Sequence, residues 1–175
     1  VPHNILYRLP SDMPFEHAAF IEPVSVAVHA VDRLTIQHGE RAGVVGSGMI
    51  GLLVLKALQV AGCPEGIAVD IVPGRLALAK EVGATATIDS KQSDAIQRVL
   101  ELTDGEGADI AVEVVGNAPA LATAIASVRR GGRIGLVGNL PPEVPFPLQA
   151  VVTRELTLFG SCSSAGEYAR ATEKV

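Results

Sequence analysis

Short apolar runs alternate with helical patterns over most of the chain. From Arg41 onward the runs cover residues 43–45, 67–69, 86–88, 110–112 and 134–137. Continuous apolar runs are typical of strands that helices cover on both faces of a sheet. Strands that alternate with helices form right-handed crossovers in a parallel sheet. The pattern therefore predicts an α/β fold with a doubly wound parallel sheet.

A last apolar run, residues 156–159, follows the proline-rich segment PPEVPFP at residues 141–147. We expect this run to form a further strand near the edge of the sheet. An edge strand leaves backbone donors and acceptors unpaired, so it can pair with a second subunit. The chain is therefore expected to form a homo-oligomer.

The two ends of the chain differ from this alternating region. A helix is expected to begin at Pro23, because proline suits the first turn of a helix. Its apolar stripe has helical spacing and consists of Val24, Ala27, Val28, Val31 and Leu34. Residues 166–175 contain good helix formers and no stop signal, which predicts a truncated helix. We therefore divide the chain into residues 1–33, 34–165 and 166–175.

The segment MIGLLVLKALQVAG, residues 49–62, is apolar on nearly every side of the expected helix. A helix that covers only a sheet shows a wide polar side. We expect a domain missing from this chain to cover the second face, with a neighbouring subunit as the alternative.

Composition excludes several classes of partner. The net charge is −5, and aromatic residues make up 3% of the chain with no Trp, so nucleic acid is a poor partner. No apolar stretch reaches the roughly 18 residues that a membrane span requires. The two cysteines are far apart in sequence and suggest neither a disulfide framework nor a zinc knuckle. A reducing, cytoplasmic location is expected.

Three glycines carry the main candidate chemistry. Gly46, Gly48 and Gly51 form G-x-G-x-x-G directly after an expected strand and at the start of an expected helix. In a Rossmann fold the first glycine allows a tight turn, the second lets a pyrophosphate approach, and the third lets helix and strand pack closely. The spacing alone is a weak signal, and its position between strand and helix makes it strong. The loop predicts dinucleotide binding over residues 34–165.

An acidic residue stands at the end of the next run. Asp70 lies 19 residues after Gly51, near the spacing at which a carboxylate binds the ribose hydroxyls. A carboxylate there repels a 2′-phosphate, so NAD is favoured over NADP. A turn-forming Asp at a strand end is the alternative. Arg75 could contact the adenine or a phosphate, or be a solvated residue at a helix start.

Two more expected strands end in glycine. The first ends at Val114-Val115-Gly116-Asn117 and the second at Val137-Gly138-Asn139. Open α/β sheets bind ligands at the carboxyl ends of their strands, and small residues there let a flat ring lie against the backbone. An ordinary turn glycine explains each position equally well.

Several segments together resemble the medium-chain zinc alcohol dehydrogenase superfamily, most closely its polyol branch, which includes sorbitol dehydrogenase. They are FIEPVSVAVHA (20–30), GERAGVVGSGMIGLL (39–53), VVGNAPAL (114–121), GGRIGLVGN (131–139) and LFGSC (158–162). The resemblance covers nearly the whole chain. It implies that residues 1–33 end a catalytic domain and that the rest binds NAD.

The resemblance also implies roles for individual residues. Asp70 would bind the ribose, Arg75 the adenosine and Ile50 the nicotinamide ring. Glu22 matches a position that ligates the catalytic zinc, or holds its water, in members of the superfamily. The remaining expected cofactor contacts are Gly46, Gly48, Met49, Gly51, Val115, Gly116, Val137, Gly138, Asn139 and Cys162.

The chain departs from the superfamily at the metal. No Cys and no Gly-His-Glu motif precede Glu22, and the clustered cysteines of the structural zinc loop are absent. Catalytic zinc takes three protein ligands and an open position, which a lone Glu cannot provide. None of the four histidines is assigned a catalytic role. We therefore expect zinc only in the full-length protein, and no activity from this chain alone.

The predicted function is that of the NAD-binding domain of a zinc-dependent dehydrogenase for a polyol or a secondary alcohol. A zinc-free relative of the quinone reductases and a non-catalytic NAD-binding sensor remain alternatives. A methyltransferase fits the close spacing of the glycines less well. The Tyr-to-Lys spacing of the short-chain dehydrogenases is absent, because Thr172 follows Tyr168 at that distance and Ser11 follows Tyr7.

Overall fold

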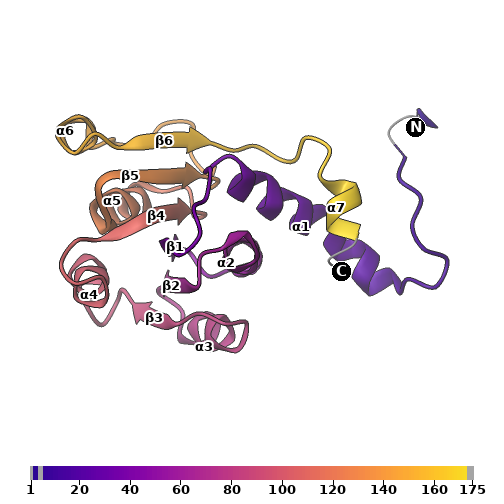
Figure 1. Cartoon of the computed structure of the whole chain (residues 1–175), viewed down its shortest axis with the longest axis horizontal. Helices are drawn as coiled ribbons and strands as arrows, with labels where there is room; N and C mark the ends of the chain where they lie inside the picture. The colour runs from indigo at the N-terminus through magenta and orange to yellow at the C-terminus, as the bar shows by residue number, and fades with distance from the viewer. Residues whose placement is uncertain (1, 4–5, 173–175) are drawn as a thin grey trace.

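The computed structural model describes residues 2–3 and 6–172, which fold into three layers with a parallel sheet in the middle (Figure 1). The strands are β1 (Arg41–Val45), β2 (Glu65–Asp70), β3 (Ala86–Asp89), β4 (Ala108–Glu113), β5 (Val128–Leu136) and β6 (Thr157–Gly160). The helices are α1 (Phe15–Asp32), α2 (Met49–Ala61), α3 (Pro73–Glu81), α4 (Ala95–Leu102), α5 (Ala118–Ser127), α6 (Leu148–Thr153) and α7 (Tyr168–Thr172).

The sheet has the order β3-β2-β1-β4-β5-β6, and every neighbouring pair is parallel. The order reverses between β1 and β4, which is the point where open α/β sheets bind ligands. All strands run in one direction, so their carboxyl ends meet at one edge. The predicted doubly wound fold is confirmed, and β6 is the edge strand that the sequence indicated.

Each face of the sheet has its own core. On one face, α1, α2 and α3 pack over side chains such as Val44, Val54 and Ile110. On the other, α4 and α5 pack over side chains such as Val69, Ala111 and Ile134. Aliphatic residues and alanines fill both cores, which agrees with the low aromatic content.

The amino ends of three strands are tied by Asp109. Its carboxylate accepts hydrogen bonds from the backbone N–H of Arg41 at 2.8 Å and from Nε of Arg129 at 2.6 Å. Burial raises the pKa of Asp109, but these hydrogen bonds and the charges of the two arginines lower it below its ordinary value. These hydrogen bonds lie at the amino ends of the strands, at the opposite edge of the sheet from the candidate site.

Helix α1 begins eight residues before the predicted start. It runs from Phe15, and Pro23 lies buried inside it. The segment FEHAAFIE contains enough helix formers to extend the helix, although Pro23 lacks the N–H that would bond to Ala19. Leu34 lies beyond the carboxyl end of α1, and it is fully buried. The prediction that the helix starts at Pro23 was wrong.

The described residues cover the second face of α2 only in part. Gly51, Val54, Leu55 and Leu58 of α2 are buried, and α1 packs along the helix. The residues of α1 that pack with α2 lie after Pro23, such as Ala27 and Val31. Leu53 and Val60 on the remaining side of α2 line an open hollow, and Val60 is 69% exposed, so cover by a missing domain or a neighbouring subunit stays a prediction.

The carboxyl-terminal third shows smaller differences. Strand β5 starts earlier than expected and ends at Leu136, so Val137 lies just beyond it. Helix α6 was not foreseen, because its six residues follow the proline-rich segment too closely to show periodicity. Helix α7 begins the expected last helix, whose final residues 173–175 lie outside the described part of the chain. Within the described residues, none of the helices has the length and apolar character needed to span a membrane.

Candidate functional site

The glycine loop joins β1 to α2 at the carboxyl edge of the sheet. Gly46 has φ +101°, and a Cβ there would lie 2.6 Å from Cγ2 of Val115. A Cβ at Gly51 would overlap the carbonyl oxygen of Gly46. A Cβ at Gly48 would meet no atom within 4 Å. The first and third glycines thus pack against the protein, whereas the second faces open space, as the loop's predicted role requires.

The amino end of α2 is open to an anion. Gly48 is the N-cap residue, and no side chain caps the helix or adds a negative charge to its first turn. The first N–H groups of a helix lack partners within the helix, and its dipole places partial positive charge there. Met49 and Ile50 stand in this first turn, and Met49 is exposed. The arrangement is suited to binding phosphate groups.

Asp70 lies buried at the end of β2, and its carboxylate points back to the glycine loop. One oxygen, Oδ2, accepts the N–H of Ser47 at 2.6 Å. The other, Oδ1, accepts the N–H groups of Ile71 at 2.7 Å and Val72 at 2.9 Å. A carboxylate offers about four acceptor positions, so one position on Oδ2 remains for a ligand hydroxyl. The guanidinium of Arg75, 3.8 Å from Oδ2, is half exposed beside it.

The ends of β4 and β5 cross in close contact. Gly116 has φ +85°, and a Cβ there would lie 2.5 Å from the backbone nitrogen of Asn139. A Cβ at Gly138 would overlap the backbone of Gly116. Neither position accepts a side chain, so both glycines are required by packing as well as by any ligand. Asn117 caps α5 through its side-chain oxygen, which accepts the N–H of Ala120 at 2.9 Å.

A hollow of about 470 Å³ lies beyond the ends of β5 and β6. We call it the β5–β6 hollow. The structure places the expected residues Val137, Gly138, Asn139 and Cys162 together around it. Other residues around the hollow were not expected there, among them Val26 from α1 and Ser161 after β6. A single apolar residue in a helix and a lone serine carry no pattern that would reveal them.

Two buried hydroxyl groups fit a bound dinucleotide. Ser47 Oγ lies in the glycine loop and Ser161 Oγ in the wall of the β5–β6 hollow, and neither has a hydrogen-bond partner in the described part of the chain. Buried polar groups are normally paired, so an unpaired one calls for an explanation. A ligand that reaches both the loop and the hollow would supply partners. The open surface of Gly48 and the uncapped amino end of α2 fit its phosphates.

The same residues do not form a metal site. No group of three or more His, Cys, Asp and Glu side chains among residues 2–3 and 6–172 is placed to hold a metal ion. Glu22 lies exposed on α1. Because catalytic zinc needs three protein ligands, Glu22 is at most one ligand of a site completed elsewhere.

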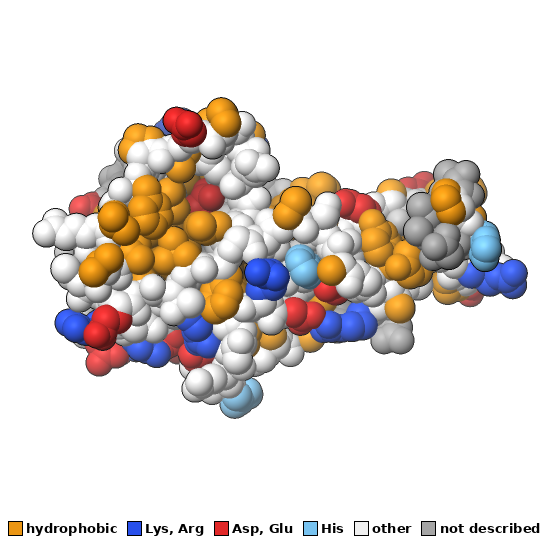
Figure 2. All heavy atoms as spheres, turned by 90° about the horizontal axis from the view of Figure 1, so that it is seen from above, with side chains coloured by type: hydrophobic (Ala, Val, Ile, Leu, Met, Phe, Trp, Pro, Cys, Tyr) orange, Lys and Arg blue, Asp and Glu red, His pale blue; other side chains and the backbone are white. Residues whose placement is uncertain are grey.

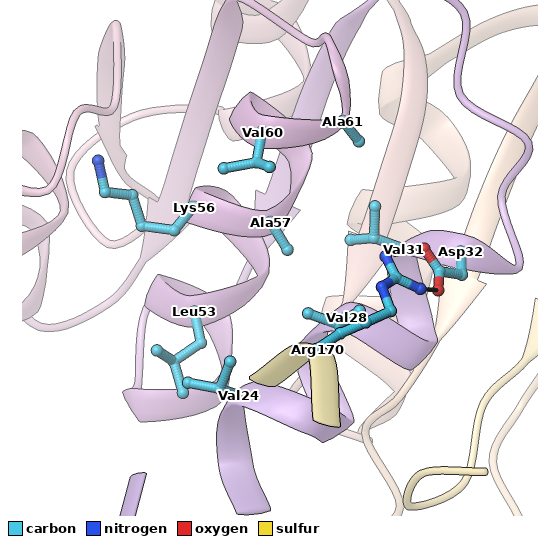
Figure 3. A pocket seen from close by; sticks show the side chains of 10 residues that line it. All are labelled: Val24, Val28, Val31, Asp32, Leu53, Lys56, Ala57, Val60, Ala61 and Arg170. Carbon is cyan, nitrogen blue, oxygen red and sulfur yellow. Dashed lines mark hydrogen bonds and ion pairs between the residues drawn. The ribbon is translucent and has the colours of Figure 1, made fainter. Parts of the chain in front are cut away.

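A second hollow, of about 500 Å³, lies between α1, α2 and α7 (Figure 3). Its lining side chains are mostly apolar, such as Val28, Leu53 and Val60. Asp32 and Arg170 form an ion pair at its rim. It lies away from the strand ends and offers no row of backbone N–H groups. The carboxyl edge of the sheet is therefore the better candidate site for a dinucleotide.

Comparison with known proteins identifies the family of this chain. The sequence profile of the family described as zinc-binding dehydrogenase matches residues 50–175. Sorbitol dehydrogenase of Bacillus subtilis (strain 168) is 36% identical over 172 residues, which are 97% of this chain and 48% of that enzyme. The chain thus spans about half the length of the curated relatives it matches.

Solved structures show the same relationship. The crystal structure of 2R,3R-butanediol dehydrogenase from Bacillus subtilis has a TM-score of 0.91 and 31% identity, over 99% of this chain and 50% of that one. A protein described as a zinc-binding dehydrogenase from Sinorhizobium meliloti 1021, bound to NADP, has a TM-score of 0.90 and 29% identity, over 99% and 52% of the two chains. The chain therefore belongs to the zinc-binding dehydrogenases, as a member of the polyol branch of the zinc-type medium-chain alcohol dehydrogenases.

Proposed function

We propose that this chain is the NAD-binding domain of a dehydrogenase that transfers hydride between NAD and a polyol or a secondary alcohol. The observation that carries the proposal is the contact between Asp70 and the glycine loop, which sets a buried carboxylate beside an uncapped helix start. Relatives named sorbitol dehydrogenase and D-xylulose reductase support the substrate class. They favour a dehydrogenase over a sensor module.

Each part of the site has a task in the proposed reaction. The N–H groups at the start of α2 hold the diphosphate, and the free acceptor position of Asp70 takes a ribose hydroxyl. Val137, Gly138 and Asn139 line the space for the nicotinamide, with Cys162 on its far side. Bound NAD supplies an electrophilic ring carbon that accepts hydride. The chain's residues orient that ring and exclude water from one of its faces.

The proposed preference for NAD over NADP rests on the charge and the burial of Asp70. Asp70 is almost fully buried and already accepts three backbone N–H groups, so a 2′-phosphate would meet its charge with no new donor from that side. Arg75 acts in the opposite sense, because its half-exposed guanidinium could pair with a phosphate. One structural relative is described as bound to NADP, so the family includes a protein that binds the phosphorylated cofactor. The proposal is that Asp70 dominates, because it is buried and fixed.

Calorimetric titration of this chain with NADH and NADPH tests the cofactor assignment. We expect NADH to bind at least about tenfold more tightly than NADPH, a difference of about 1.4 kcal/mol. The variant Arg75→Ala serves as a control and should weaken NADPH more than NADH. Absence of binding by either nucleotide, or a preference for NADPH, would remove the assignment.

The catalytic part of the proposal concerns the full-length protein. We place its zinc outside this chain, because the described residues hold no metal site. The purified full-length protein should oxidise sorbitol or a related polyol with NAD and contain zinc, whereas the 175-residue chain should be inactive. A full-length protein that lacks zinc and reduces quinones instead would favour the zinc-free alternative.

The edge strand supports a homo-oligomer as part of the proposal. Hydrophobic side chains gather over the side of the molecule formed by α6 and β6 (Figure 2). They include Leu140, Phe146, Leu148 and Val152, which are exposed. A second copy paired along β6 would cover both the strand edge and this patch. Equilibrium sedimentation should show a dimer or larger species, and a monomer at all concentrations would contradict the pairing. A cytoplasmic location stays a prediction, in keeping with the free state of Cys63 and Cys162.

A further inference from the structure

Glu113 is a buried acidic residue that the proposed reaction does not use. It is the last residue of β4, is 2% exposed, and forms no ion pair with the described residues. Burying a carboxyl group is unfavourable unless hydrogen bonds replace its water. An apolar residue at this position would continue the apolar run of β4 without the cost of burying a carboxyl group. The presence of a buried acidic residue at this position therefore calls for an explanation.

The hydrogen bonds of Glu113 reach both of the strand ends that meet in the site. Its Oε1 accepts the N–H groups of Val115 and Gly116, each at 2.8 Å. Its backbone oxygen accepts the N–H groups of Val137 at 2.9 Å and Gly138 at 3.1 Å. One residue thus binds two consecutive amides on each of the two segments that meet at the crossing of β4 and β5. All four amides belong to residues that the sequence analysis expects to contact the cofactor.

The side-chain bonds of Glu113 lie at a closely packed turn. Gly116 has φ +85° and lies in contact with the backbone of Gly138 and Asn139. Val115 in turn lies against Gly46 of the glycine loop. With Oε1 removed, two N–H groups at this crossing would lose their acceptor. The turn after β4 would then be free to move away from the β5–β6 hollow.

We propose that Glu113 is a positioning residue for the cofactor, whose carboxyl oxygen fixes the turn 114–116 against residues 137–139 and so shapes the surface on which the nicotinamide half lies. The inference rests on the proposed NAD-binding function. Glu113 acts through the backbone and does not touch the reacting atoms. The feature that matters is an acceptor at Oε1, which a glutamine also provides.

Three variants of the 175-residue chain test this role, with NADH and AMP as probes. AMP carries the adenosine and one phosphate but no nicotinamide. Glu113→Ala should weaken NADH binding by about tenfold or more and change AMP binding by less than about threefold. Glu113→Gln should keep the NADH affinity within about threefold of wild type. Gly116→Ala disturbs the same crossing but leaves Glu113 in place. It should also weaken NADH binding while leaving AMP binding nearly unchanged.

Thr103→Val is the matched control. Thr103 is fully buried just before β4, where its hydroxyl bonds to the carbonyl of Val99 and accepts the N–H of Gly107. The change should lower the unfolding temperature without changing the NADH affinity. Equal loss of NADH and AMP binding in Glu113→Ala, loss in Thr103→Val, or failure of the Gln variant to retain binding would overturn the inference.

Amide hydrogen exchange keeps the inference separate from the proposed function. Exchange at Val115 and Gly116 should become faster in Glu113→Ala and stay slow in Glu113→Gln. If wild-type protein binds no NADH, the proposed function fails while this exchange pattern still reports on the turn. If exchange at both amides is the same in wild type and Glu113→Ala, the positioning role is wrong whatever the binding result.

Discussion

Replacing Asp70 by asparagine tests whether this residue holds the glycine loop in the absence of any ligand. Asparagine can keep one oxygen on the N–H groups of Ile71 and Val72, but its amide group then faces the N–H of Ser47. Two donors cannot bond to each other, and Ser47 is 1% exposed, so water cannot replace the lost acceptor. The variant therefore leaves a buried N–H without a partner.

The expected cost follows from that one contact. An unpaired buried donor costs about 1–3 kcal/mol, and the lost bond is one to a charged group. We expect Asp70→Asn to lower the free energy of unfolding by that amount. Urea titration followed by circular dichroism measures it, because the chain contains no Trp for fluorescence. NADH affinity should fall as well, since Ser47 directly precedes Gly48, the glycine of the loop that faces open space.

Asp89 provides the matched control. It is the register partner of Asp70 on β3 and also ends its strand, but its Oδ1 accepts only the exposed N–H of Lys91. Asp89→Asn should change stability by less than about 0.5 kcal/mol. If Asp70→Asn unfolds at the same urea concentration as wild type, Asp70 does not hold the loop. The reasoning would also fail if both variants lost equal stability.

Three more measurements examine other features of the structure. Gly51→Ala should destabilise the fold by at least about 1–3 kcal/mol, whereas Gly48→Ala should leave stability nearly unchanged and weaken NADH binding; the opposite order would contradict the loop geometry. Asp109, whose pKa is lowered in the native state, stabilises the fold above the ordinary Asp pKa of about 3.9, and this contribution disappears as the pH falls through its native pKa. Acid titration of Asp109→Asn should therefore show a weaker loss of stability than wild type. A thiol reagent at pH 8 should label the exposed Cys162 quickly, and NADH should slow this, while Cys63, whose pKa burial raises to about 11, should stay unlabelled until the protein unfolds.

The sequence predicted the sheet well because strands that are buried on both faces consist of continuous apolar runs. The apolar runs marked all six strands to within a few residues, except that β5 starts several residues earlier than expected, at Val128. That early part of β5 contains Arg129, Gly131 and Gly132, which carry no apolar signal. Periodicity likewise missed the extension of α1 before Pro23, because that half of the helix is mostly exposed.

The candidate site was predictable at positions where the local backbone or the ligand requires one particular residue type. Gly46, Gly51 and Asp70 occupy the positions that their spacing indicated. The contact of Asp70 with Ser47 and the four amides around Glu113 depend on how distant segments meet, so spacing could not reveal them. One local signal existed for Glu113, because it is a charged residue at the end of an otherwise apolar run.

Pro23 divides α1 into two parts that should differ in their motions. Most residues before it are exposed, whereas those after it pack against the sheet and α2. Without a proline N–H, the carbonyl of Ala19 is open to water and the early turns can fray without disturbing the later ones. The amide hydrogens of these early turns should therefore exchange faster than those of the turns after Pro23.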